Sequence, residues 1–373
     1  MRSDHLQRKQ QFTAIGCGLD RLSLRWCWQC SYTCLARHLE AATTKGGTIV
    51  FDGTTSPSQG VHADPTIDPV AQAWRHPDAP ATLASAEMAT FRAALRTDGL
   101  DVRESILREL ADYHGYSPEE CLRRCLHWED WSVEEWNSAD RSTAAGVQDF
   151  YQSVQSWTFD LMWYAYLQST GHGFPAPVLA ARFATDHAPG RDHLDFGSGT
   201  GTTAQLFTRL GFRSTMADVS EPLLQYARWR LARHGDRATT IDLTTSELPS
   251  ANYDVITALD ALVHVTDFDA TVRDLRRAVR PGGYVLANFD VRDPDDYGNQ
   301  WHLQTDAHGL DHRLRAAGFV RTRTLGGVTH CYRAVDPTRP TFRARTIIDR
   351  TMLPLQRTTT RARGRARALL RRG

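Results

Sequence analysis

Three glycines at alternating positions constrain this chain more than any other feature. The segment HLDFGSGTGTT, residues 193–203, places Gly197, Gly199 and Gly201 directly after a short apolar stretch, and a helical pattern begins near Thr202. Glycine has no Cβ, so it allows a tight turn and lets the backbone approach a ligand closely. The free N–H groups of a following helix point at whatever is bound there. The segment therefore predicts a ligand-binding loop between a strand and a helix.

The surrounding region alternates between strands and helices. The pattern predicts strands at 193–196, 214–219, 239–243, 255–259 and 284–289, and helices at 202–210, 222–234, 268–279 and 310–317. Gly326 and Gly327 separate two further expected strands, 320–325 and 328–334, as the turn of a hairpin does. Such an alternation predicts an α/β fold with a mostly parallel sheet and an antiparallel strand at one side.

Two acids accompany the glycine loop. Asp195 lies two residues before Gly197, and Asp218 ends the next expected strand, 17 residues after Gly201. A carboxylate at the second position can accept both hydroxyls of a ribose, which suits any nucleoside-like cofactor. An acid beside the loop repels a pyrophosphate but attracts a ligand that carries an amine and a sulfonium. The charge pattern therefore favours S-adenosylmethionine (SAM) over NAD, and the G-x-G-x-G spacing also departs from the usual dinucleotide loop.

Four motifs in the same order resemble those of the class I SAM-dependent methyltransferases. LDFGSGTG resembles their first motif, MADVSEPLLQYAR their second, and IDLTTSELPSANYDVITALDALVHVTD their third and fourth, as in small-molecule enzymes of the ubiquinone and menaquinone methyltransferase type. LRRAVRPGGYVLANFD is similar to the turn that precedes their fifth strand. The resemblance covers about residues 180–335. It implies a Rossmann-like sheet of seven strands whose last strand is antiparallel.

The resemblance also implies roles at the glycine loop and at its two acids. Gly197, Gly199 and Gly201 would shape the cofactor loop. Asp195 would lie near the methionyl amine, directly or through water. Asp218 would bind the ribose diol. The alternative for both acids is a simple strand-end or turn position.

Five further positions take cofactor or site roles from the same resemblance. Asp242, followed by Leu243, would accept a hydrogen bond from the adenine amine. Leu259 and Asp260 would lie beside the methionyl part of the cofactor, and His264 would stand at the edge of the site. Two alternatives stay open here, since Asp242 could be a surface acid and His264 could pack between helices without any chemistry.

A helical pattern occupies residues 80–172, ahead of the α/β region. Ser117 and Ser132 are each followed three residues later by Glu, which is the signature of a helix start. In a helix expected over 154–168, Trp157 and Tyr164 share one face. That face could simply pack in a core, or its rings could wall the pocket for the methyl acceptor. Trp157 and Tyr164 are therefore candidates for substrate contact.

A polar segment rich in histidine follows the fifth expected strand, over 288–314. In the family this connection commonly reaches over the acceptor. His302, beside Trp301, is the leading candidate for a general base, with His264 second, and Trp301 is a candidate for substrate contact. A hydroxyl acceptor needs such a base, a neutral amine does not, and a carbon acceptor needs an activated ring or enol. An ordinary loop histidine, with a pKa near ~6.5, is the alternative reading. The other candidates are Asp290, His308 and His312.

Composition limits the partners and the compartment. The formal net charge is +1 over 373 residues, which does not favour a dedicated nucleic-acid or membrane binder. No apolar run approaches the ~20 residues of a transmembrane helix, and the first 30 residues lack the apolar block of a signal peptide, so we expect the cytoplasm. Residues 341–373 hold ten Arg and one Asp. Such a tail is usually solvated, but it could contact RNA, anionic lipid or another anionic partner.

Residues 1–60 have weak periodicity. Cys17, Cys27, Cys30 and Cys34 have a spacing that hints at a metal or iron–sulfur site, but no His or Cys pair follows at zinc-finger spacing, and we expect no metal. The alternatives are an apolar segment rich in thiols and an over-extended translation start.

We therefore expect four parts. These are a poorly defined or over-annotated N-terminus (1–60), a helical region that caps the acceptor (61–178), a SAM-binding methyltransferase domain (179–336) and an Arg-rich tail (337–373). The expected reaction moves a methyl group from SAM to an O or N atom, or a C atom, of a small molecule. Two alternatives stay open: an NAD-type oxidoreductase on a related fold, and a non-catalytic module that binds SAM or serves as a scaffold.

Overall fold

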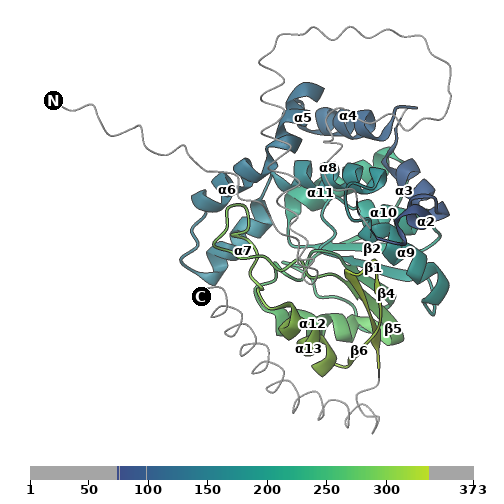
Figure 1. Cartoon of the computed structure of the whole chain (residues 1–373). Coiled ribbons are helices and arrows are strands. Elements are labelled where there is room, and N and C mark those ends of the chain that lie inside the picture. Colours follow the sequence, from purple (N-terminus) through teal and green to yellow (C-terminus); the bar gives the residue numbers. More distant parts are fainter. Residues whose placement is uncertain (1–73, 75, 98, 336–373) are drawn as a thin grey trace, which may run out of the picture. The chain divides into compact units, whose positions relative to one another are not determined.

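The computed structural model of this chain describes residues 74, 76–97 and 99–335. All of them belong to the second of two compact units into which the chain divides, Phe51–Gly373. Within that unit a sheet carries helices on both faces (Figure 1). The N-terminal segment with its four early cysteines and the Arg-rich tail lie outside the described residues.

The sheet has seven strands in the order β3-β2-β1-β4-β5-β7-β6. Strands β1 to β5 run parallel, and β7 lies antiparallel between β5 and β6. This confirms the Rossmann-like α/β fold with its closing hairpin. The order reverses between β1 and β4, and ligands of open α/β sheets bind at such a reversal. The strands are β1 Asp192–Phe196, β2 Arg213–Asp218, β3 Thr239–Asp242, β4 Tyr253–Ala258, β5 Val279–Ala287, β6 Phe319–Leu325 and β7 Thr329–Ala334.

The central strands and their helices form the core. Every residue of β4 is buried, as a parallel strand covered on both faces requires. On α12 the buried residues Phe268, Val272 and Leu275 recur at helical spacing and face the sheet, whereas Arg273 and Arg277 are exposed. The helices of this part are α9 Ala176–His187, α10 Thr202–Arg209, α11 Glu221–Arg233, α12 Phe268–Ala278 and α13 Ala307–Ala316.

The segment before the sheet is helical, as expected. In Figure 1 its helices gather on the side of the sheet that carries α10 and α11, opposite α12 and α13. Within the described ranges, no helix is both long and apolar enough to cross a membrane. The helices are α2 Ala79–Leu83, α3 Ala86–Leu95, α4 Val102–His114, α5 Pro118–Leu126, α6 Trp128–Ser138, α7 Ala144–Ser153 and α8 Trp157–Thr170.

One of the two predicted helix starts is correct. The Ser117 hydroxyl accepts the Glu120 N–H at 3.2 Å and begins α5. The start at Ser132 is wrong, because α6 begins at Trp128 and Ser132 lies inside it, buried. The Ser132 hydroxyl pairs instead with that of Ser156 at 2.6 Å, just before α8. A Ser followed by Glu at this spacing also occurs within helices, and here tertiary packing decides the side-chain partner.

Candidate active site

The glycine loop after β1 needs glycine for two physical reasons. Gly197, Gly199 and Gly201 have φ values of +67°, +51° and +74°, a region that residues with a Cβ rarely adopt. Space is also short, because a Cβ on Gly197 would lie 2.4 Å from the Cβ of Ala261, and one on Gly199 would lie 2.6 Å from the Cδ1 of Leu161. Leu161 belongs to α8, so a helix from the N-terminal region lies directly against this loop.

Asp195 connects the elements on either side of the glycine loop. Its carboxylate accepts the backbone N–H of Ala204 at 3.1 Å and the hydroxyl of Thr257 at 2.7 Å, so it joins the first turn of α10 to β4. Its exposure is only 3%, and burial, with a further contribution from nearby Asp218, raises the pKa of Asp195 to about 7. Asp195 therefore fixes the start of α10, directly after the loop, to the neighbouring strand β4.

Asp218 shapes the loop from the side. One of its oxygens accepts the Gly199 N–H at 2.8 Å, and the other accepts the Ser220 N–H at 2.9 Å. Burial raises the pKa of Asp218, and these N–H bonds oppose the shift. Each carboxylate oxygen can accept a second hydrogen bond, so two ribose hydroxyls can still be accommodated.

Asp242 lies next to Asp218 on the neighbouring strand, because the two residues pair in the register of β2 and β3. Its carboxylate accepts the hydroxyl of Thr244 at 2.6 Å and the Thr244 N–H at 2.8 Å. These bonds, the hydroxyl first, hold the pKa of Asp242 below its usual range. The N–H of Leu243 donates to the backbone carbonyl of Asp218 at 2.9 Å. Asp242 and Leu243 therefore lie at the carboxyl ends of the parallel strands, as the glycine loop does.

Leu259 and Asp260 follow β4 at its carboxyl end, and both are half-buried. Asp260 has a φ of +54°, and its N–H donates to the side-chain oxygen of Asn288 at 3.0 Å. The Asn288 amide in turn donates to the Asp260 carboxylate. Burial, and then the charge of Asp290, raise the pKa of Asp260 to about 7. Asn288 comes just after β5, so it joins the ends of the two strands, a role that no sequence pattern indicated.

A cluster of rings lies beyond the end of β4. The backbone carbonyl of Trp301 accepts two donors, the Tyr151 hydroxyl at 2.5 Å and Nδ1–H of His264 at 2.9 Å. The His264 ring lies 5.7 Å from that of Trp157 and 4.8 Å from that of His302, measured between centroids. Four candidates, His264, His302, Trp157 and Trp301, therefore come together. Tyr151, a fifth member from α7, was not anticipated.

Both histidines of this cluster depart from the ordinary imidazole. Burial lowers the pKa of His264 to about 4. It also lowers the pKa of His302 to about 2, with help from His264 and Arg292. The expectation of an ordinary loop histidine near ~6.5 is therefore wrong for His302, because burial removes the water that would stabilise the charged form. The alternative for His264, packing without chemistry, stays open.

Sequence reasoning also missed Asp160 and Arg292. The guanidinium of Arg292 binds Asp290 through Nε at 2.8 Å and Nη2 at 2.6 Å. Burial raises the pKa of Asp160 to about 7, and Arg292 partly opposes that rise. A signal for Asp160 was present, because it is the one charged residue in the apolar run WTFDLMWYAYL, residues 157–167.

Comparison with known proteins identifies the domain that holds this site. Residues 169–323 match a family model described as a methyltransferase domain, and the sheet has the seven strands and the antiparallel last strand that the resemblance implies. Residues 169–323 therefore form a methyltransferase domain.

Two curated relatives and one solved structure illustrate the similarity. The chain is 33% identical over 161 residues to ubiquinone biosynthesis O-methyltransferase of Alkalilimnicola ehrlichii, a match that covers 38% of this chain and 65% of that protein. The protein of the same name from Nitrosospira multiformis is 31% identical over 112 residues, covering 29% and 46%. The structure of 1,6-didemethyltoxoflavin-N1-methyltransferase from Burkholderia thailandensis is 20% identical, covers 43% of this chain and 77% of that one, and has a TM-score of 0.36. The chain thus spans about half to two thirds of the length of these curated relatives.

The remaining candidates occupy other positions around the methyltransferase domain. The ring of Tyr164 lies against Gly173, where an added Cβ would be 3.1 Å from its Cε2. Tyr164 is about two helical turns from Trp157, toward the other end of α8. His308 and His312 belong to α13 rather than to a loop, and His308 is exposed. The ring cluster and the glycine loop therefore hold most of the candidate residues.

Proposed function

We propose that this chain transfers a methyl group from SAM to an O or N atom of a small molecule. The observation that carries the proposal is the charge at the glycine loop. Asp195 and Asp218 are both buried there, and burial raises both pKa values. Among the described residues, no cationic side chain contributes to lowering either pKa. A cofactor that brings an ammonium and a sulfonium compensates such a pair, whereas the pyrophosphate of NAD adds charge of the same sign.

Thermal unfolding with each cofactor tests this proposal. At a SAM concentration about 100 times Kd, binding adds about 2.7 kcal/mol to the free energy of unfolding, which raises the Tm by roughly 5–10 °C. NAD at the same concentration should leave the Tm unchanged. A rise with NAD and none with SAM would favour the oxidoreductase. SAM binding without methyl transfer to any of a broad set of small acceptors would favour the non-catalytic module.

We place His264 first among the base candidates for an O-acceptor. Its Nδ1–H bond to the Trp301 carbonyl leaves the lone pair on Nε2, which is the atom that would accept a proton. His264 is half-buried, whereas His302 is only 6% exposed, so an acceptor can reach His264 more readily. The low pKa keeps His264 neutral and therefore competent as a base, although a weaker one than an ordinary histidine.

The variant His264→Asn tests this role. Asn can still donate an N–H toward the Trp301 carbonyl, but it has no basic nitrogen. For a hydroxyl acceptor we expect the single-turnover rate to fall by ~10²–10⁴-fold while the Kd for SAM stays within about twofold. Tyr151→Phe, which removes the other donor to the same carbonyl, should change the rate far less. A parental rate in His264→Asn would mean that positioning alone drives transfer, as for a neutral amine.

We further propose that the helical region contributes the acceptor wall. Leu161 packs on the glycine loop, and Trp157 packs on His264, so α8 faces both the cofactor side and the acceptor side of the site. A small, partly aromatic or polyhydroxylated metabolite suits a wall made of Trp157 and His264, which are half-buried, whereas Trp301 and His302 are buried.

A further inference from the structure

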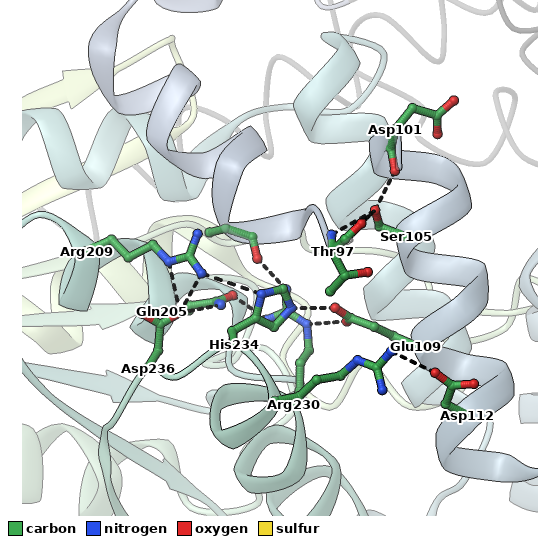
Figure 2. Close-up of polar contacts among 12 residues, drawn as sticks. Thr97, Asp101, Ser105, Glu109, Asp112, Gln205, Arg209, Arg230, His234 and Asp236 are labelled. Carbon is green, nitrogen blue, oxygen red and sulfur yellow. Dashed lines mark hydrogen bonds and ion pairs between the residues drawn. The ribbon is translucent and has the colours of Figure 1, made fainter. Parts of the chain in front are cut away.

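A buried polar network joins the helical region to the helix that starts at the glycine loop (Figure 2). Its centre is Arg230 on α11, whose side chain has no exposed surface. The guanidinium donates Nε–H to Glu109 of α4 at 2.9 Å, Nη1–H to Gln205 of α10 at 2.6 Å and Nη2–H to the carbonyl of Ala94 near the end of α3 at 3.0 Å. One side chain therefore contacts three other helices.

The partners of Arg230 are themselves held in place. Glu109 has no exposed side-chain surface and also binds His234, which follows α11. Burial alone would raise the pKa of Glu109, but the charge of Arg230 and the His234 bond hold it below its usual range. Ala94 lies in the last turn of α3, where backbone carbonyls lack helical partners and a cation is favourable. The network is therefore charged and buried, and each guanidinium nitrogen of Arg230 has a partner.

Gln205 carries the network to the cofactor loop. Its side-chain oxygen accepts from Arg230, and its amide donates to Asp236 at 2.7 Å, so both ends of the amide are occupied. Gln205 lies in the first turn of α10, and its neighbour Ala204 donates its N–H to Asp195. That turn begins at Gly201, which supplies no side-chain cap. The first turn is thus held from β1 through Ala204 and from α11 through Gln205.

We propose that Arg230 and Gln205 are positioning residues for the glycine loop, and that α3 and α4 act on the loop through them. Glu109 sets the orientation of Arg230, Arg230 sets that of Gln205, and Gln205 fixes the turn that follows the loop. The cofactor part of this inference rests on the function proposed above. Small displacements of a binding loop weaken a ligand strongly, because the loop must be reordered when the ligand binds.

The variant Gln205→Met tests this proposal without leaving a buried charge unpaired, since Arg230 keeps Glu109. Met matches the length of Gln but neither donates nor accepts strongly. We expect amide hydrogen exchange at residues 199–204 to rise by about tenfold or more, and the Kd for SAM to rise by about tenfold. The kcat at saturating SAM and the KM for the acceptor should stay near the parental values. Gln205→Glu keeps an oxygen toward Arg230 but sets a second carboxylate oxygen against Asp236, so it should recover only part of the SAM affinity.

The matched control is Asp112→Ala. Asp112 pairs with Arg233 at 2.8 Å, so it joins the same two helices, α4 and α11, but at the surface. It should leave both the exchange of the loop and the Kd for SAM unchanged, because exposed pairs contribute little.

A folded Gln205→Met protein with parental exchange at 199–204 would overturn the proposal, and so would an equal effect of Asp112→Ala. Failure of the function proposed above looks different. In that case the parental protein itself binds no SAM, which removes the cofactor role, while the exchange measurement still decides whether the network positions the loop.

Discussion

The Asp218 carboxylate accepts backbone N–H groups from Gly199 in the loop and from Ser220 at the start of α11. The resemblance expects the same carboxylate to bind the ribose diol. A single acid thus serves the shape of the loop and, in our proposal, the cofactor. Asp195 differs, because its partners Ala204 and Thr257 belong to α10 and β4 rather than to the loop.

Replacing Asp218 with Asn should weaken SAM binding while the protein remains folded. The change removes the charge and turns one acceptor oxygen into a donor, which faces an N–H or a ribose hydroxyl. Charge-assisted hydrogen bonds contribute ~1.5–3 kcal/mol, or about 10- to 150-fold in affinity. Calorimetric titration measures the loss. Asp192→Asn, at the start of β1 and paired with Arg213 and Arg280, serves as the control. Equal Kd values for Asp218→Asn and the parental protein would remove Asp218 from the site.

The pH dependence of methyl transfer reports on the environment of His264. A base must be unprotonated, and burial lowers the pKa of His264 to about 4, so the active form prevails throughout the neutral range. For an O-acceptor we expect a single-turnover rate that is level between about pH 6 and 8 and falls only as pH approaches 4. A limb near ~6.5 that disappears in His264→Asn would show that this histidine is hydrated in the working enzyme, contrary to the packing described here.

At the scale of elements, the contact between the glycine loop and α8 joins the methyltransferase domain to the helices that precede it. Gly199 has a positive φ and faces Leu161, whereas Gly211, at the turn after α10, also has a positive φ (+84°) but has no atom within 4 Å of an added Cβ. At Gly211 an added side chain would meet only the unfavourable backbone conformation, whereas at Gly199 it would also meet the Leu161 side chain.

Alanine substitutions at these glycines should have unequal effects on stability. Gly211→Ala should lower the free energy of unfolding by about 1–2 kcal/mol, because only the left-handed backbone is penalised. Gly199→Ala should lower it further, because its Cβ meets Leu161, and adding Leu161→Ala should recover part of the difference. Urea unfolding curves measure all four proteins. Equal losses for the two glycines would contradict the close contact between α8 and the loop.

The helices and strands were largely predictable from the sequence, whereas the hydrogen-bond partners of individual side chains were not. Strand ends were within two residues of the expected ones, because apolar periodicity and glycine turns are local signals, except at β5. That strand starts at Val279, five residues before the expected start, and includes the Pro-Gly-Gly segment expected to be a turn. The cap at Ser117 was predictable for the same reason, but Ser132 shows the same pattern inside a helix. The site residues Asn288 and Arg292 carry no local signature, since their roles depend on where β5 ends relative to β4 and on which acids lie opposite.

At the scale of the whole molecule, a buried charge pair joins distant parts of the chain. Glu109 and Arg230 are separated by 121 positions, and both side chains are fully buried. No sequence pattern could have paired them. Removing one member of such a pair leaves the other charge buried, which is far more destabilising than losing a surface pair.

Glu109→Gln should therefore lower the free energy of unfolding by about 3–5 kcal/mol. Glu221→Gln is the control, since Glu221 and Arg228 form an exposed pair that contributes less than about 1 kcal/mol. The folded pKa of Glu109 is lowered, so its contribution is present above the unfolded pKa and is lost as pH falls through the folded value. The two variants should accordingly differ most near neutral pH. Similar urea midpoints for both would contradict the burial of the Glu109–Arg230 pair.

The measurement that tests the account most directly is calorimetric titration of the parental protein with SAM at pH 7 in two buffers of different ionisation enthalpy. Burial raises the pKa of Asp195 to about 7, so this acid is partly protonated before the cofactor binds. A cationic cofactor favours its charged form, lowers its pKa and expels the proton. We predict saturable binding of SAM with release of a fraction of a proton per site, and no binding of NAD. Binding of NAD with no response to SAM would contradict the account.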